Sequence, residues 1–304
     1  MLSLKNVYIF QASIGIFTNA FLFLFHIFTI HQDHRPKPTD VTTCHLAFVH
    51  IVMLLTALDI LSADIFKSLN FPNDLKCKAW LYLSRVMRGL SICTTCLLSV
   101  IQVITISPST FFLSRFKHKF TNYISDTFFC FWSLNLSSNS YMIIYTVANS
   151  NMTNLFNINK FCSLSSMNPI IMELFLTVAL SQNVFFVGLM LLSSAYMVIF
   201  LSSHQRRSDY LHSRRVFPRT SPAKRATQTV LLLVSFFVIM YCLDIIMSSV
   251  STILGKYDPV VLDVQRLVGN VYATVSPLVL ISSDKRIVGI LQSMLDMASI
   301  LTSR

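Results

Sequence analysis

The sequence predicts an all-α membrane protein, a bundle of seven transmembrane helices with its N-terminus outside the cell and its C-terminus in the cytosol. Of the 304 residues, 54% are hydrophobic and only 12% are charged, whereas a soluble domain carries about 25% charged residues. So few charges cannot cover the surface of a globule in water. The composition therefore excludes a soluble domain, and the same apolar excess excludes intrinsic disorder.

The second observation is a series of long apolar segments. A transmembrane helix needs about 20 mostly apolar residues, because lipid offers no partner to unpaired backbone groups. Four segments meet this requirement easily, at about 7–30, 43–66, 170–201 and 227–252. They lack the alternation of polar and apolar residues that a membrane β-barrel requires, which favours helices.

Three further segments are apolar but interrupted by polar residues. The third span, 77–107, contains Arg85 and Arg88. The fourth, 123–148, is diluted by an aspartate, an asparagine and several serines, and the seventh, 260–283, has two charges near its start. Together with the four clear segments they give seven spans in a single domain.

The third observation is the distribution of lysine and arginine, which sets the orientation. The loops after the first, third and fifth spans, together with the tail at 284–304, hold 15 of these residues, whereas the opposite loops hold five. Positive residues concentrate on the cytosolic side of membrane proteins. We therefore place the tail in the cytosol and attribute the net charge of +11 to cytosolic loops rather than to nucleic-acid binding.

The positions of the seven cysteines predict a disulfide on the outer side of the membrane. Five of the seven fall inside predicted spans, where a thiol packs as a small apolar group. Cys77 and Cys162 lie at the outer side, at the start of the third span and in the second outer loop, where oxidising conditions favour a disulfide. Asn151 opens an Asn-Met-Thr sequon in the same loop, so we expect it to be glycosylated.

Nothing in the sequence indicates an enzyme. It contains no zinc-protease box, no nucleophile elbow and no phosphate-binding loop. Cys93 and Cys96 form a Cys-x-x-Cys motif, but a structural zinc needs four ligands and no second pair follows. We expect neither a metal nor a cofactor.

Charges inside the membrane are costly enough to require an explanation. Arg85 and Arg88 are three residues apart and so share a helical face, about 12 and 17 Å below the outer end of their span. The acidic residues expected in the same outer half are Asp59, Asp64, Glu173 and Asp244. They could pair with the arginines to hold helices together, or line an outer cavity that binds a small molecule, or do both.

The third cytosolic loop, at 204–225, carries seven cations among its 22 residues. Such a run can be a topology signal or a contact with anionic lipid. It also flanks the fifth and sixth spans, where a change in the bundle could open a groove to a cytosolic partner. The basic residues that we assign to this contact are Arg206, Arg207, Arg214, Arg215, Lys224 and Arg225.

Seven spans with an outer N-terminus and a basic third inner loop resemble the G-protein-coupled receptors, and local sequence narrows the resemblance to the vomeronasal type-1 receptors. The stretches that carry it are Arg85–Pro108, Thr220–Ser235, Arg35–Asp40, His45-Leu46 and Thr274–Leu280. The resemblance implies a plasma-membrane receptor that binds a pheromone or a small odorant. It also implies coupling to a heterotrimeric G protein of the inhibitory class.

The chain differs from the usual pattern at a few positions. Gln102–Ser107 stands where rhodopsin-like receptors have an Asp-Arg-Tyr triplet, as it does in this family. Thr18 replaces a glycine of the family, His50 replaces an asparagine, and Ala223-Lys224 departs from the Ser-Pro-Glu stretch before the sixth span. These differences leave the expected fold unchanged and bear on coupling.

Two other functions are compatible with parts of the pattern. A bitter-taste-type receptor also lacks the Asp-Arg-Tyr triplet, although the third span argues against it. A small-solute transporter or channel could use Asp59, Arg85 and Asp244 as a charge relay. Activation of a G protein without solute flux would distinguish a receptor from a transporter.

Overall fold

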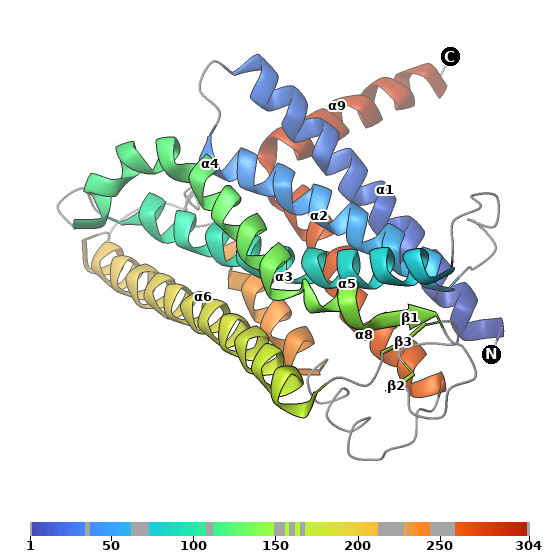
Figure 1. Ribbon diagram of the computed structural model, residues 1–304. Coiled ribbons are helices and arrows are strands. Elements are labelled where there is room, and N and C mark those ends of the chain that lie inside the picture. Colours follow the sequence, from blue (N-terminus) through green and yellow to red (C-terminus); the bar gives the residue numbers. More distant parts are fainter. Residues whose placement is uncertain are drawn as a thin grey trace.

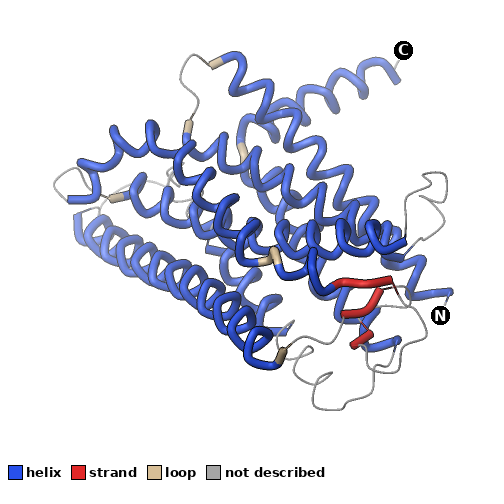
Figure 2. Tube along the Cα trace, viewed as in Figure 1, coloured by secondary structure: helices blue, strands red, loops and turns tan. Residues whose placement is uncertain are grey.

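The computed structural model describes most of the chain as helix. The described residues are 2–33, 37–61, 73–107, 112–148, 156–157, 162–164, 168–211, 228–229, 231–243 and 259–302. Within them, long helices pack side by side, and a few short strands lie at one end of the bundle, the end where the N-terminus also lies (Figure 1 and Figure 2).

The helices are α1 (Leu2–Gln32), α2 (Pro38–Leu61), α3 (Asn73–Ile106), α4 (Phe112–Ser138), α5 (Tyr141–Tyr145), α6 (Pro169–Leu211), α8 (Pro259–Ser283) and α9 (Lys285–Thr302). A further apolar helix, the segment 231–243, lies in the chain between α6 and α8. The strands are β1 (Thr146–Ala148), β2 (Phe156–Asn157) and β3 (Cys162–Leu164). They form an antiparallel sheet in the order β1-β3-β2, in which Ala148 pairs with Cys162 and Asn157 with Ser163.

Several helices are long and apolar enough to cross a membrane. They contain the segments Asn6–Gln32, Pro38–Leu58, Lys78–Ile106 and Glu173–Phe200. The shorter apolar helices are Leu231–Leu243 and Leu267–Ser283. The third span therefore qualifies in spite of its two arginines, because the helix downstream of them is apolar to its end.

The distribution of side chains is the reverse of that in a soluble protein. Large apolar side chains on α1 and α6 are open to the surroundings, with Phe17 76% and Leu192 70% exposed. Polar side chains such as Asn19 and His50 are 1% exposed. Apolar surface on this scale is not found on soluble monomers, so these faces are the ones that contact lipid.

The core is built around α3, which contacts α2, α4 and α6. One buried cluster joins Ile92 of α3, Met190 of α6, Phe237 of the segment 231–243 and Tyr272 of α8. The thiol of Cys93 is free and buried in the same cluster, where it packs as an apolar group.

One helix differs in its bounds from the expected span. The sequence predicts the fourth span at 123–148, but α4 begins earlier, at Phe112, and ends at Ser138. Its end coincides with a run of polar residues whose side chains bond backbone carbonyls: Asn139 Nδ2 donates to the carbonyl of Asn135 at 2.9 Å, for example. Such bonds offer the backbone an alternative to helix. The described chain is helical as expected, apart from the three short strands.

Candidate functional site

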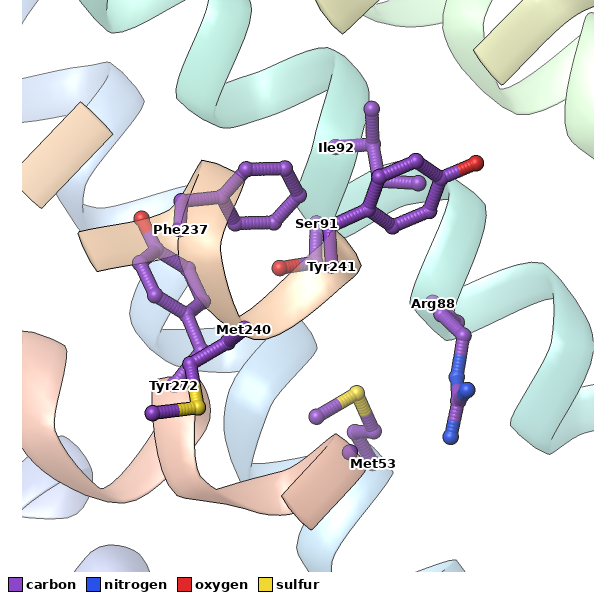
Figure 3. A pocket seen from close by; sticks show the side chains of 9 residues that line it. Met53, Arg88, Ser91, Ile92, Phe237, Met240, Tyr241 and Tyr272 are labelled. Atoms are coloured by element: carbon purple, nitrogen blue, oxygen red, sulfur yellow. The ribbon is translucent and has the colours of Figure 1, made fainter. Parts of the chain in front are cut away.

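A pocket opens between α2, α3, the segment 231–243 and α8 (Figure 3). It encloses about 410 Å³ of empty space, part of which is open to the surroundings. The residues that line it are Met53, Arg88, Ser91, Ile92, Phe237, Met240, Tyr241, Gly269 and Tyr272. Mostly apolar walls with a few polar groups are typical of binding sites for small organic molecules.

Arg88 supplies the charge of this pocket. It comes from the middle of α3 and is half-buried. Its guanidinium reaches α8, where a Cβ atom placed on Gly269 would lie 2.8 Å from Nη2 and 3.4 Å from Cζ. Among the lining residues Arg88 alone carries a charge, and a guanidinium keeps its proton and presents a planar fork of donors.

The opposite wall is aromatic. Figure 3 shows Arg88 and Met53 on one side of the pocket and Phe237, Met240 and Tyr272 on the other. The rings of Phe237 and Tyr272 meet edge to face with their centroids 4.7 Å apart, an arrangement that aromatic pairs prefer. The two methionines are flexible and can adapt to ligand shape. The pocket therefore combines apolar walls with one fixed positive charge.

Buried His50 connects the pocket to the interior of the bundle. Its Nε2 lies 2.9 Å from Ser91 Oγ, and its Nδ1 lies 3.2 Å from Ser276 Oγ. Its ring meets the edge of Tyr272 with 5.5 Å between centroids, and the Tyr272 hydroxyl lies 3.0 Å from Thr95 Oγ1. Because Ser91 and Tyr272 line the pocket, His50 ties the pocket wall of α3 to that of α8.

A second polar cluster fixes α2, α3 and α4 relative to one another. Trp132 Nε1 donates to His45 Nε2 at 3.0 Å, so this nitrogen is the acceptor of a neutral ring. The other nitrogen, Nδ1, then carries the proton and donates to Thr94 Oγ1 at 3.0 Å. Phe128 stacks on the same ring at 4.4 Å. This cluster joins α2 and α4 to α3.

Asn135 of α4 forms a third buried contact with α3. Its Nδ2 donates to the carbonyl of Phe131 at 2.8 Å and to Cys93 Sγ at 3.5 Å. Its Oδ1 accepts from Gln182 Nε2 of α6 at 3.1 Å. The Asn135 side chain fits only because Gly89, one residue after Arg88, has no side chain: a Cβ there would overlap Asn135 Oδ1. The turn of α3 that carries Arg88 is thus held against α4 and α6.

The structure separates the two arginines that the sequence places together. Arg88 lines the pocket, whereas Arg85 is exposed and is not among the lining residues. Glu173 is exposed near the start of α6 and likewise does not line the pocket. The backbone of Asp59 lies in α2, but its side chain is outside the described part. Asp64 and Asp244 lie outside the described residues altogether.

The other predicted sites fall partly outside the described chain. Cys77 lies in α3, and Cys162 in β3, which pairs with a strand that contacts α3. Nothing further is described of their side chains, and Asn151 lies outside the described residues. The backbones of Arg206 and Arg207 lie in the last turns of α6. Outside the described residues lie Arg214, Arg215, Lys224 and Arg225.

The sequence does not single out most of the pocket. Phe237 and Tyr241 are four residues apart, and Gly269 and Tyr272 are three apart, so each pair shares a helical face. This spacing is the available signal, but it is equally typical of residues that only pack. Among the residues that the structure describes, no group of three His, Cys, Asp or Glu side chains could hold a metal ion.

Comparison with known proteins identifies the family. A sequence profile of the vomeronasal organ pheromone receptor family matches residues 2–293. The chain belongs to the vomeronasal type-1 receptor family. It is 40% identical over 293 residues to vomeronasal type-1 receptor 90 of Rattus norvegicus, covering 96% of this chain and 94% of that receptor. It is 37% identical over 294 residues to vomeronasal type-1 receptor 47 of Mus musculus, covering 96% and 94%.

The family assignment confirms the resemblance carried by the third span and by the stretch before the sixth. It makes the chain a chemosensory receptor of the membrane and not a member of an enzyme family. The long apolar helices described above are consistent with a membrane receptor of this family.

Asp40 belongs to an ionic cluster at the end of the bundle opposite the strands (Figure 1). Arg286 donates to Asp40 through Nη2 at 2.7 Å and Nη1 at 3.3 Å, and to Asp284 through Nη2 at 2.8 Å. Burial alone would raise the pKa of Asp284, but its hydrogen bonds with Arg286 outweigh burial and lower it. His26 Nδ1 of α1 lies 3.3 Å from Asp40. The cluster ties α1 and α2 to the start of α9.

Proposed function

We propose that this chain is a seven-span vomeronasal receptor of the plasma membrane that binds a small pheromone or odorant in the pocket beside Arg88. Ligand binding would activate a cytosolic heterotrimeric G protein, of the inhibitory class by family resemblance. The observation that carries the proposal is the pocket itself, in which one arginine faces apolar and aromatic walls. The N-terminus would lie outside and α9 in the cytosol, as the loop charges indicate.

The lining favours an apolar molecule that bears an acidic or hydrogen-bond-accepting group. The fork of Arg88 would bind that group, while the rings of Phe237 and Tyr272 would pack on the apolar part. Ser91 adds a hydroxyl that is already bonded to His50. A hydrogen bond in which one partner is charged is stronger than a hydrogen bond between neutral groups.

Binding would act by shifting the population of receptor conformations. The pocket lies between helices that contribute different walls, so a ligand that contacts Tyr241 and Tyr272 together favours one relative position of the segment 231–243 and α8. Any state with better contacts to the ligand becomes more populated. A helix of the G protein would then enter a groove at the cytosolic end.

The remaining sequence-based sites keep their proposed roles. We propose a disulfide between Cys77 and Cys162 that holds the outer loop near α3, and glycosylation at Asn151. Arg85, Glu173, Asp59 and Asp244 would belong to the outer mouth of the binding site rather than to its wall. The fact that strand β3 pairs with β1, which contacts α3, supports the disulfide.

Neutralising four basic residues of the third inner loop is expected to weaken coupling. With glutamine at Arg206, Arg207, Arg214 and Arg215, maximal G-protein activation should fall at least about fivefold, equivalent to about 1 kcal/mol of interface energy. The concentration of an activating compound that gives a half-maximal response should change far less, because these residues belong to the predicted third inner loop and are not among the residues that line the pocket. The measurement is nucleotide exchange on the G protein in membranes from expressing cells.

The control for this experiment removes the same number of charges from the predicted outer side. It carries glutamine at Lys67, Lys76, Lys160 and Lys256. Surface display of both variants must be measured first, because positive residues also set topology. Full activation by a normally displayed inner-loop variant would reject the coupling role.

The charge of the pocket can be tested before any ligand is identified. A Met240→Cys receptor is treated from outside with sulfonatoethyl methanethiosulfonate, an anion, or trimethylammonioethyl methanethiosulfonate, a cation. Two unit charges about 10 Å apart at an effective dielectric constant of about 20 interact by about 1.7 kcal/mol. Arg88 should therefore favour the anion, and Arg88→Gln should lower the ratio of the two rates at least about tenfold.

The parent receptor, which keeps Met240, reports any reaction of the native thiols, including exposed Cys130 and Cys242. Arg85→Gln is the matched control for Arg88→Gln, since Arg85 is exposed and does not line the pocket. It should change the ratio much less. Equal effects of the two substitutions, or an unreactive thiol at position 240, would contradict a pocket whose charge is Arg88.

A further inference from the structure

We propose that Gly269 is a specificity-determining residue of the binding pocket because it sets the position of the Arg88 guanidinium. This inference rests on the proposed function and adds to it a residue that does not bind ligand through a side chain of its own. Gly269 of α8 and Arg88 of α3 both line the pocket.

The contact between the two residues is close and broad. A Cβ placed on Gly269 would lie 2.8 Å from Nη2, 3.4 Å from Cζ and 3.5 Å from Nη1 of Arg88. Much of the guanidinium therefore lies against the bare backbone of α8. Any side chain at position 269 would occupy the space where this group now lies.

The backbone gives no other reason for a glycine here. Gly269 lies inside α8, between Val268 and buried Asn270, both helical. In a helix interior glycine is less favourable than alanine. The chain has only six glycines, and this one coincides with the guanidinium of the pocket.

An alanine at position 269 would move the guanidinium rather than the helix. The atoms that it would meet are Nη2, Cζ and Nη1, the far end of a long side chain that can change rotamer. The charge would stay in the pocket but would be offered to a ligand from a different place. Residue 269 would thus select ligands by where their acceptor group lies relative to their apolar part.

The test uses the two methanethiosulfonates on Met240→Cys receptors. Gly269→Ala should change the ratio of anion to cation rates at least about threefold where Arg88 is present, because the interaction energy depends on charge separation. In an Arg88→Gln background the same substitution should leave the ratio unchanged. Gly188→Ala is the matched control, since nothing lies within 4 Å of a Cβ at that glycine.

The outcomes separate this inference from the proposed function. An equal effect of Gly269→Ala with and without Arg88 would show that the methyl group only fills the pocket, and no effect in either would show that Gly269 does not position Arg88. Both would overturn the inference while leaving the anion preference of the Met240→Cys receptor intact. Loss of that preference before any change at position 269 would instead reject the proposed site. If Gly269→Ala abolishes surface display, Arg88→Gln must restore it, and failure to do so also overturns the inference.

Discussion

Gly89→Ala is expected to remove most of the folded receptor from the cell surface. A methyl group on Gly89 would overlap Oδ1 of Asn135 and come within 2.9 Å of its Cγ. The Asn135 side chain is short and is held by Phe131 and Gln182, so it has little room to move. Overpacking of this kind costs about 1–3 kcal/mol, and the loss of the Gln182 bond adds to it. Antibody binding to an N-terminal tag on intact cells measures the effect.

Two comparisons identify the cause of the loss. Gly188→Ala adds the same methyl to α6, where nothing lies within 4 Å, and should not lower display. Asn135→Ala in the Gly89→Ala background removes the overlapping atoms, so the double variant should be displayed better than Gly89→Ala alone. Additive losses would show that Gly89 and Asn135 act independently.

Arg286→Ala is expected to destabilise the receptor by about 2 kcal/mol. This is less than for a fully buried pair, because the Arg286 side chain is 40% exposed and water screens the interaction. The Asp40 side chain is 5% exposed and accepts two bonds from Arg286. His26, at 3.3 Å, stays near the carboxylate and limits the cost. The loss also removes a cation–π contact with Phe25, at 5.7 Å. Thermal unfolding of the receptor in detergent provides the measurement.

Lys285→Ala is the matched control, because Lys285 is the exposed neighbour of Arg286. Adding Asp40→Asn to Arg286→Ala removes the uncompensated charge of the buried carboxylate and should recover part of the stability. A double variant less stable than Arg286→Ala would mean that Asp40 is held mainly by His26 or by the backbone.

The sequence predicts the helical membrane architecture well because lipid imposes long apolar segments. It predicts Arg88 as a candidate for the same reason: a charge in such a segment needs a partner or a function. It cannot distinguish Arg88 from Arg85, because three residues on a helix leave both near one face, and only packing against α8 decides which one enters the pocket.

The sequence fails where short-range chemistry decides the outcome. The end of α4 at Ser138 depends on side-chain bonds such as that of Asn139 with Asn135, which compete with a marginal helix. Gly269 has no functional side chain, and its proposed role follows only from the contact between the Arg88 guanidinium and the backbone of α8. The sequence alone gives no reason to assign Tyr272 more than a packing role. The structure shows that it contacts Phe237 and His50 and lines the pocket.

Ligand binding in this pocket is tested most directly by asking whether an activator protects the thiol of a Met240→Cys receptor from reaction. A panel of small organic compounds is screened for G-protein activation on cells that express this variant. Each activator is then tested for its effect on the reaction of the introduced thiol with sulfonatoethyl methanethiosulfonate. If activators bind in this pocket, a saturating activator slows this reaction at least about tenfold, as expected for a site that is more than nine-tenths occupied. An activator that saturates the response and leaves the reaction rate unchanged would contradict binding in this pocket.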